Sequence, residues 1–562
     1  MYFSPISINT FLHWFALLIS MFCATTITIN AQPLSGEKTH FTRGDTLRGT
    51  LTADRNWFDV VHYNLHLSVF PDKRAIQGYN EIYFLVQKQH VTMQLDLFQN
   101  LNIDSVVFNN KILKVKRDFN AFFINFSDKL PLNSVQKLRV YYSGTPIVAR
   151  NAPWDGGFVW SKDKNKNPWI SVACQGIGAS IWWPNKDHQS DEPDSMRISI
   201  AAPKNLVCAS NGMPTDTLPE GEYTRWNWMV KNPINNYAVS FTLADLVHYA
   251  DTFKQADASV LPINYYVLRY NLDKAKKHFA QVKPMLRCYE EKMGPYPFPE
   301  DGFALIETPF LGMEHQSGIA YGNNYKTGYA GMDYSGIGLQ FDYIIIHEAG
   351  HEWWGNSITS ADIADLWIHE GFCTYAEALY VECLHGYQTM LDYCNAGKNR
   401  VSNDIPIIGP YGVNHEGSGD MYTKGMLMLH TIRQVINNDQ IWTQIIKGLL
   451  TDYRHKIVTT DTILQYMNAK SGLKLDLIFD QYLRYPNIPT LEYKVNPKGT
   501  SVKMRWVANV SNFNMPCGWY DANGKLHYIQ PTTDWKTFII PRTKPNQFKI
   551  AEDRFYINAV KK

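Results

Sequence analysis

The spacing of hydrophobic residues changes twice along this chain, and each change marks a different kind of structure. From about Trp57 to Asp245, apolar and polar residues alternate, as in β-strands with one buried face. After about Leu261 the apolar spacing becomes helical, and from about Pro489 the alternation returns. The sequence therefore predicts a multidomain α+β protein in which an α-rich region lies between two β regions.

Turn-forming residues separate short strands in both β regions. Many short strands between Asn, Asp, Gly and Pro turns predict a saddle-like sheet or a β-sandwich in the N-terminal region. The C-terminal region predicts a small β-sandwich, and Asn523-Gly524 between apolar stretches is a hairpin signal. We place an N-terminal signal segment and three domains at residues 1–31, 49–247, 248–487 and 488–562.

The middle region contains several stretches with helical spacing. Leu272–Met293 predicts one helix with a kink at Pro284, because proline removes a backbone donor and clashes with the preceding turn. Glu370–Cys394 predicts a second long helix. Further helices are predicted at Tyr343–Asn356, Met421–Asn437, Asp461–Lys470 and Leu475–Tyr485.

The N-terminus is typical of an export signal. The run from Phe11 to Ala24 carries no charged residue, and Ala31 offers a small residue before a cut ahead of Gln32. An uncleaved anchor and a lipid on Cys23 are the alternatives, although the run is short for a bilayer span of about 20 residues. We expect export to the periplasm or the exterior, and a mature chain without a membrane span.

Composition narrows the kinds of function that remain. The formal net charge is +2, so no overall electrostatic attraction draws the chain to nucleic acid or anionic membrane. The eight cysteines are scattered without C-x-x-C spacing, which predicts neither a disulfide framework nor a cysteine zinc site. One or two disulfides are possible after export, and we expect the other cysteines in the core. The function must therefore be read from local sites.

A metal site is predicted by the run H-E-A-G-H at residues 347–351. On a helix, His347 and His351 lie on one face about 6 Å apart along the axis, so both imidazoles can reach one ion. Glu370, at the predicted start of the next helix, supplies a third ligand. Zinc takes such nitrogen and oxygen ligands and keeps a fourth position for water, with Glu348 beside it as general base. We predict one zinc ion per chain.

Two further side chains lie close to these ligands in the sequence. Glu377 lies two helical turns after Glu370 on the same face, so it suits either an acid that orients a metal ligand or one that is paired locally or exposed. His369 precedes Glu370 and cannot face the same way. We leave His369 outside the ligand set.

With these motifs in place, the chain resembles the M1 family of zinc aminopeptidases, the aminopeptidase N and leukotriene A4 hydrolase group among the gluzincins. Residues 347–356 match H-E-x-x-H-x-W-x-G-N, residues 312–315 resemble G-x-M-E-N, and residues 422–425 resemble Y-x-K-G. The resemblance covers roughly Trp57 to the end and implies a saddle-like N-terminal sheet, a thermolysin-like catalytic domain and a β-sandwich. Many relatives continue into a large helical domain, so we expect a short form.

The resemblance implies roles for residues outside the metal motif. Glu314 and Gln175 would bind the α-ammonium of the substrate, Gly312 and Met313 would lie along its backbone, and Tyr422 would donate a hydrogen bond to the oxyanion. A phenol with an ordinary pKa of about 10 remains a donor at neutral pH.

The chain departs from the family pattern at two positions. His315 stands where the family usually has Asn, which puts in doubt how the substrate backbone is held. Ser180 stands where an Arg is common near the residue matched by Gln175.

The predicted function is hydrolysis of the N-terminal residue from peptides that have a free N-terminus. A thermolysin-like endopeptidase needs the same metal residues but no amine anchor, and an epoxide hydrolase activity like that of one family branch is a further alternative. A catalytically silent peptide-binding protein on this scaffold would need neither Glu348 nor Tyr422. No nucleic-acid partner is expected, and the sequence specifies neither the oligomeric state nor the preferred first residue.

Overall fold

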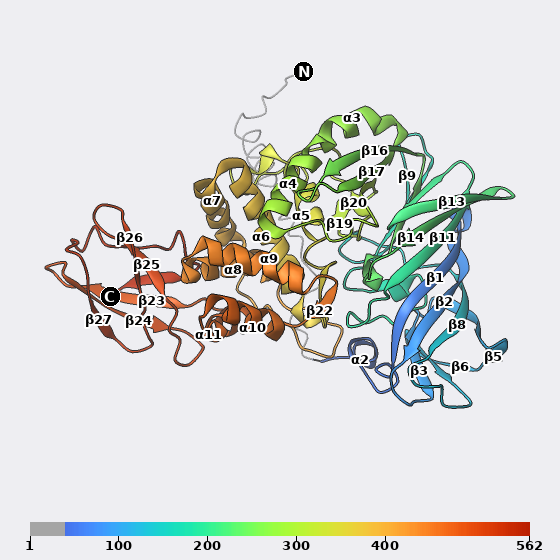
Figure 1. Cartoon of the computed structure of the whole chain (residues 1–562), viewed down its shortest axis with the longest axis horizontal. Coiled ribbons are helices and arrows are strands. Elements are labelled where there is room, and N and C mark those ends of the chain that lie inside the picture. Colours follow the sequence, from blue (N-terminus) through green and yellow to red (C-terminus); the bar gives the residue numbers. More distant parts are fainter. Residues whose placement is uncertain (1–39) are drawn as a thin grey trace, which may run out of the picture. The chain divides into compact units, whose positions relative to one another are not determined.

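A computed structural model describes residues 40–562 of the chain (Figure 1). The predicted export signal and Cys23 lie outside the described residues. The described residues form a strand-rich region, then a helical region, then a second strand-rich region, which confirms the predicted multidomain α+β order. Within residues 40–562, no helix is long and apolar enough to span a bilayer.

The N-terminal region is built on a mixed eight-stranded sheet. Its strands follow the order β13 (Met213–Glu220), β14 (Tyr223–Val230), β11 (Ser195–Pro203), β1 (Phe58–Phe70), β2 (Ala75–Val86), β8 (Val135–Gly144), β4 (Leu101–Phe108) and β5 (Lys111–Leu113). In β1 the predicted alternation appears as burial of Tyr63, Leu65 and Leu67. Strand β1 pairs with β2 antiparallel and with β11 parallel, so it occupies the middle of the sheet.

Three smaller sheets complete the region before the metal-binding helices. One contains β3 (Thr92–Asp96), β7 (Ala121–Asn125) and β6 (Val115–Asp118). A second contains β12 (Val207–Ser210), β15 (Phe241–Ala244), β10 (Pro168–Ala173) and β9 (Gly157–Lys162). The third contains β16 (Leu246–Lys254), β17 (Val260–Leu268), β18 (Phe303–Glu307), β20 (Ile319–Tyr321) and β19 (Gly312–Met313). One buried core spans these sheets. It includes Trp57, Ile198 and Met313, so it extends to strand β19, where Gly312 and Met313 are predicted to contact the substrate backbone.

Helices dominate the middle region. They are α3 (Leu272–His278), α4 (Val282–Met293), α5 (Tyr343–Gly350), α6 (Trp367–His385), α7 (Tyr387–Gly397), α8 (Thr423–Ile436), α9 (Asp439–Asp452), α10 (Thr460–Ser471) and α11 (Asp476–Arg484), with a short parallel pair β21 (Ile358–Ser360) and β22 (Lys456–Val458). A further short helix, α2 (Arg43–Gly49), precedes β1 and begins with a capping box at Thr42.

The helix predicted over Leu272–Met293 is two helices. A 3-10 turn, Phe279–Gln281, separates α3 from α4. The predicted kink at Pro284 is wrong, because this residue lies in the first turn of α4. Backbone N–H groups there have no acceptor within the helix, so proline removes nothing.

The helix predicted over Glu370–Cys394 is also two helices. Gly386 has a φ of 81° and separates α6 from α7. This backbone conformation favours glycine, so a single Gly within an apolar run was the signal for the break. Helix α9 was not predicted, although Asn438 caps it by accepting hydrogen bonds from the backbone N–H groups of Gln440 and Ile441.

Two small sheets form the C-terminal region. The first contains β27 (Lys536–Ile539), β24 (Ser501–Val507), β23 (Thr490–Val495) and β29 (Asn558–Lys561), and the second contains β26 (Leu526–Ile529), β25 (Cys517–Tyr520) and β28 (Lys549–Ile550). The predicted hairpin at Asn523-Gly524 is confirmed between β25 and β26. Trp506 and Trp519 belong to the same buried core as Phe372 of α6, so the C-terminal sheets support the catalytic helices directly.

The cysteines follow the expected division between one disulfide and the core. Cys288 of α4 and Cys383 of α6 form a disulfide. The free cysteines among the described residues are all buried: Cys174, Cys208, Cys373, Cys394 and Cys517. The bridge ties together two helices that pack beside the metal-binding helix.

Candidate active site

Helix α5 presents the first two predicted metal ligands. Its N-cap residue, Asp342, accepts a hydrogen bond from the backbone N–H of Ile344 and so fixes where the helix begins. Ile345 and Ile346 are fully buried, so the helix lies inside the core and not on the surface. His347 and His351 then extend from the same face of this buried helix.

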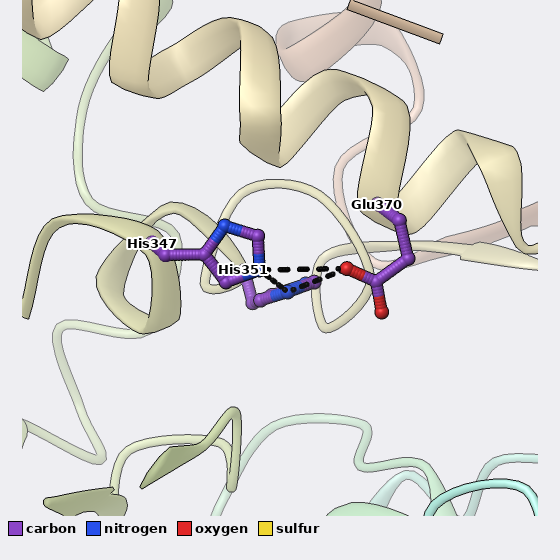
Figure 2. Close-up of side chains that lie close together, drawn as sticks. All are labelled: His347, His351 and Glu370. Carbon is purple, nitrogen blue, oxygen red and sulfur yellow. Dashed lines mark hydrogen bonds and ion pairs between the residues drawn. The ribbon is translucent and has the colours of Figure 1, made fainter. Parts of the chain in front are cut away.

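The two imidazoles meet the Glu370 carboxylate at one point (Figure 2). The Nε2 atoms of His347 and His351 lie 3.3 Å apart, and their distances to Glu370 Oε2 are 3.5 and 3.3 Å. Glu370 Oε2 is buried and has no hydrogen bond with any described residue. Two imidazole nitrogens and one carboxylate oxygen gathered in this way are the donor set of catalytic zinc, so the residues fit the predicted metal.

A second group of donors lies beside the first. Glu314, Glu348 and His351 also bring their ligand atoms within 4.8 Å of one another. Glu314 is already hydrogen-bonded to Gln175, whereas Glu370 Oε2 has no such partner. The geometry therefore favours His347, His351 and Glu370 as the ligands, with the other two carboxylates facing the substrate.

Hydrogen bonds behind the metal site fix the orientation of both imidazoles. His347 Nδ1 lies 2.7 Å from Glu377 Oε1, and the other Glu377 oxygen accepts a hydrogen bond from the Tyr393 hydroxyl. His351 Nδ1 lies 3.0 Å from the carbonyl oxygen of Trp354. When Nδ1 carries the proton in each ring, both Nε2 atoms are free to bind metal. Of the two alternatives for Glu377, the structure shows the contact with a ligand.

Glu348 projects from the same helix toward strand β19. A Cβ atom on Gly312 would lie 2.9 Å from Glu348 Oε1 and 2.5 Å from Ile344 Cγ2. Only glycine leaves room for this approach, which explains why the strand begins with that residue. Burial raises the pKa of the Glu348 carboxyl above its ordinary value. A carboxyl with a raised pKa can both accept and release a proton near neutral pH.

The structure brings Gln175 and Glu314 together although 139 positions separate them. The Gln175 side-chain amide donates hydrogen bonds to Glu314 Oε1 and, at 3.1 Å, to Glu370 Oε1. Glu314 is buried, and its backbone carbonyl accepts a hydrogen bond from Asn356 at 3.0 Å. Met313, which lies between Gly312 and Glu314 in the sequence, is also buried. Acceptors suited to an ammonium group therefore lie next to the metal ligands.

Tyr422 lies immediately before helix α8. Its ring stacks on that of His347, with ring centroids 6.0 Å apart. Burial raises the pKa of the Tyr422 hydroxyl well above its ordinary value, and the nearby Glu370 and Glu314 carboxylates add to the rise. The hydroxyl therefore stays protonated and can donate a hydrogen bond.

The two departures from the family pattern have different surroundings. His315 is buried, its Nε2 has no hydrogen bond with a described residue, and burial lowers its pKa to about 3. Ser180 donates to Asp187 Oδ2 at 2.5 Å, and the Arg48 guanidinium lies 3.5 Å from the same oxygen. Arg48, from α2, therefore supplies a guanidinium near the position where the sequence has Ser180.

Several residues near the site were missed by sequence reasoning. Arg48 donates hydrogen bonds to the carbonyls of Gly176 and Ile177, immediately after Gln175, and so holds that loop. Tyr237 lies close to Glu314. Burial raises the pKa of the Tyr237 hydroxyl, and the negative charge of Glu314 raises it further. No local spacing connects these residues to the metal motif. The capping box of α2 could have predicted the helix that carries Arg48, but not its contact with the site.

His369 has the non-ligand position expected for it. Its Nε2 accepts a hydrogen bond from the backbone N–H of Ser360 at 2.9 Å. Burial lowers the pKa of His369 to about 3, so the ring is neutral. It supports the loop between α5 and α6, and its Nε2 is already engaged by this hydrogen bond.

Comparison with known proteins supports the predicted resemblance. Residues 277–482, which contain the proposed metal site, match the peptidase family M1 domain. This part of the chain is similar to M1 peptidases. The chain is therefore a metallo-aminopeptidase, and the predicted resemblance is confirmed.

Named relatives share a low sequence identity with this chain. Leukotriene A-4 hydrolase of Xenopus laevis is 22% identical over 468 residues, which are 78% of this chain and 73% of the relative. Leucine aminopeptidase 2 of Neurospora crassa is 24% identical over 44% of this chain and 35% of its own length. Human endoplasmic reticulum aminopeptidase 1 is 22% identical over 38% of this chain and 24% of its own length.

Solved structures show the same fold. An M1 zinc metallopeptidase from Deinococcus radiodurans superposes with a TM-score of 0.67 at 19% identity, covering 79% of this chain and 98% of the other. A mutant of that enzyme bound to a Tyr-Ser-Ala substrate gives a TM-score of 0.66 at 18% identity, with the same coverage. The arrangement of sheet, catalytic helices and C-terminal strands is therefore that of M1 peptidases.

Proposed function

We propose that this metallo-aminopeptidase removes the first residue of peptides with one zinc ion per chain, held by His347, His351 and Glu370. The observation that carries the proposal is the buried Glu314 carboxylate, held by Gln175 beside the three metal ligands. A carboxylate binds an α-ammonium group through charge-assisted hydrogen bonds. An anchor so close to the metal selects the peptide bond nearest the free N-terminus.

The side chains of this chain supply the proton transfers. Zinc bound at the site would lower the pKa of a bound water toward about 7 and polarise the scissile carbonyl. Glu348 takes a proton from the attacking water and passes it to the leaving nitrogen. Tyr422 donates a hydrogen bond to the carbonyl oxygen as negative charge develops there. Gly312 and Met313 lie along the substrate backbone, where an edge strand such as β19 offers backbone groups for pairing.

The position of Glu314 favours an aminopeptidase over an endopeptidase. An endopeptidase would place an uncharged amide of the substrate backbone at this point, and the buried carboxylate would then lack a counter-charge. Two of the relatives are named aminopeptidases, and the Deinococcus radiodurans mutant was solved with a tripeptide substrate. We therefore assign peptides with a free N-terminus as the substrate class.

We also propose that the chain is exported to the periplasm or the exterior. The Cys288–Cys383 disulfide supports this location, because disulfides persist mainly in oxidising compartments. The uncharged run at residues 11–24 is the second support. Fractionation of cells that express the full chain tests the proposal, and recovery of the protein with reduced Cys288 in the cytoplasm would contradict it.

Chromogenic aminoacyl amides and their N-acetylated forms test the aminopeptidase assignment. The wild-type protein should cleave the free-amine forms and leave the acetylated forms intact. Glu314→Gln should lower kcat/KM on the free-amine forms about ten- to a hundredfold, as expected for a hydrogen bond to a charged group. The matched control is Glu290→Gln, which removes a half-buried carboxylate away from the site. Cleavage of the acetylated forms would instead indicate an endopeptidase.

A further inference from the structure

A partly open hollow lies next to the proposed metal site. Its walls are largely aromatic and methionine side chains, among them Tyr329, Tyr393 and Met426. Polar groups also line it, among them the carboxylate of Glu377 and the guanidinium of Arg400. A concave site that combines apolar walls with a few charged groups suits a side chain or a small ligand.

The hollow lies on the His347 side of the site, and the amine anchor lies on the His351 side. Tyr343 lines the hollow and stacks on His347, with ring centroids 5.5 Å apart. Glu377 also lines the hollow and bonds to the same histidine. Glu314, in contrast, lies with His351, and neither it nor Gln175 lines the hollow. A peptide with its ammonium group at Glu314 would thus direct its remaining residues toward the hollow.

The position of Glu348 relates the scissile bond to this hollow. Burial and the neighbouring Tyr334 raise the pKa of the Tyr329 hydroxyl in the wall to about 12, and the Glu348 carboxylate adds to the rise. In the proposed mechanism Glu348 delivers a proton to the leaving nitrogen, so the leaving part of the substrate must lie on its side. The hollow is therefore in the place where the residues after the scissile bond would bind.

Arg400 lies at the end of the 3-10 turn that follows α7, Lys398–Arg400. Its guanidinium lies over the Tyr334 ring, 4.7 Å from the ring centroid. Within residues 40–562 it has no hydrogen bond or ion pair, whereas Arg433 of α8 is paired with Glu382 and Asp439. The backbone after this turn is held by Asp420, which accepts hydrogen bonds from two successive N–H groups. Arg400 thus offers an unpaired cation at a fixed edge of the hollow.

We propose that this hollow binds the residues after the scissile bond, and that Arg400 recognises a carboxylate on that part of the peptide. The apolar walls fit an apolar side chain on the second residue. The planar guanidinium fits a carboxylate through two parallel hydrogen bonds. The carboxylate is either the C-terminus of a short peptide or an acidic side chain. The inference rests on the proposed aminopeptidase function.

Three tripeptides with the same first two residues separate the two sources of the carboxylate. They are Ala-Leu-Ala with a free C-terminus, its C-terminal amide, and Ala-Leu-Asp amide. For wild-type protein we expect a kcat/KM about five- to fiftyfold higher on at least one carboxylate-bearing peptide than on Ala-Leu-Ala amide. The range is modest because Arg400 is exposed and water screens its charge. Preference for the free acid indicates C-terminal recognition, and preference for the Asp amide indicates side-chain recognition.

Arg400→Gln should bring this ratio close to one, and Arg400→Lys should retain part of it, because lysine keeps the charge without the planar fork. The matched control is Arg287→Gln. Arg287 is also an exposed arginine over an aromatic ring, 5.4 Å from the centroid of Phe253, but it does not line the hollow. The control should keep the wild-type ratio. Inhibition by product dipeptides should weaken in the same way when their carboxylate is amidated.

The possible failures are distinguishable. If wild-type protein cleaves all three tripeptides equally, or if Arg400→Gln keeps the wild-type ratio, this inference is wrong and the aminopeptidase function stands. If wild-type protein loaded with zinc cleaves no free-amine peptide at all, the proposed function fails and the inference fails with it. An equal loss of the ratio in Arg287→Gln would show that surface charge, and not the hollow, sets the preference.

Discussion

In the proposed site, Glu377 orients His347 so that its Nε2 atom faces the metal. We therefore expect Glu377→Gln to weaken zinc binding while the three proposed ligands stay in place. The Nδ1–Oε1 distance is 2.7 Å, and the Glu377 side chain is 1% exposed, so water does not screen the contact. Glutamine keeps an oxygen at this position but removes the negative charge that makes the imidazole a stronger ligand. Loss of such a contact costs about ten- to a hundredfold in metal affinity, or about 1.4–2.8 kcal/mol.

Competition with a chromophoric chelator would measure the zinc dissociation constant of each variant. The matched control is Glu382→Gln, on the same helix, where the carboxylate pairs with Arg433 at 2.8 Å and contacts no metal ligand. We expect the control to change protein stability but to leave the zinc constant within about twofold of wild type. An unchanged zinc constant for Glu377→Gln, or an equal weakening in the control, would refute the assigned role of Glu377.

Three further changes test other parts of the structure. Tyr422→Phe should raise the transition-state free energy by about 3–4 kcal/mol, so kcat on a free-amine substrate should fall with little change in KM. An unchanged kcat would remove Tyr422 from the mechanism. Burial lowers the pKa of His430 from 6.5 to about 3, so the unfolded chain binds the extra proton and stability falls as pH drops below 6.5. Between pH 7 and pH 5 the wild-type protein should therefore lose about 2 kcal/mol more free energy of unfolding than His430→Met, measured by urea unfolding. An equal loss in both proteins would contradict this. Cys288→Ser, which opens the bridge to Cys383, should reduce the free energy of unfolding by about 2–4 kcal/mol, and the wild-type protein in reductant should show the same loss.

The cluster of His347, His351 and Glu370 was the most predictable part of the site because its geometry is local. Two histidines four positions apart on a helix must share a face, and Glu370 needed only a helix start at a suitable place. The order of β and α regions was predictable for a similar reason, since hydrophobic period is a local property of sequence. The helix breaks were less visible, because a single Gly386 and the 3-10 turn before Val282 interrupt otherwise continuous helical spacing.

The surroundings of the site depend on packing between distant segments, which spacing does not encode. Arg48, on a helix that precedes the first strand, donates a hydrogen bond to the loop after Gln175. Tyr237, in a turn that follows strand β14, lies close to Glu314. Arg400 lines the hollow and follows α7, which begins after the helix break at Gly386. The sequence prediction missed this break. Each of these residues would be an ordinary surface or core side chain if judged by its neighbours in sequence.

The most direct test of the proposed function is a crystal structure of the Glu348→Gln protein with zinc and a tripeptide, with anomalous diffraction recorded at the zinc edge. The variant keeps the ligands and removes the proposed general base, so the peptide should remain intact. We predict one anomalous peak between His347, His351 and Glu370, with the peptide N-terminus at Glu314 and Gln175. A peak in the neighbouring group that includes Glu314 and His351, or a peptide with its N-terminus elsewhere, would contradict the proposed function.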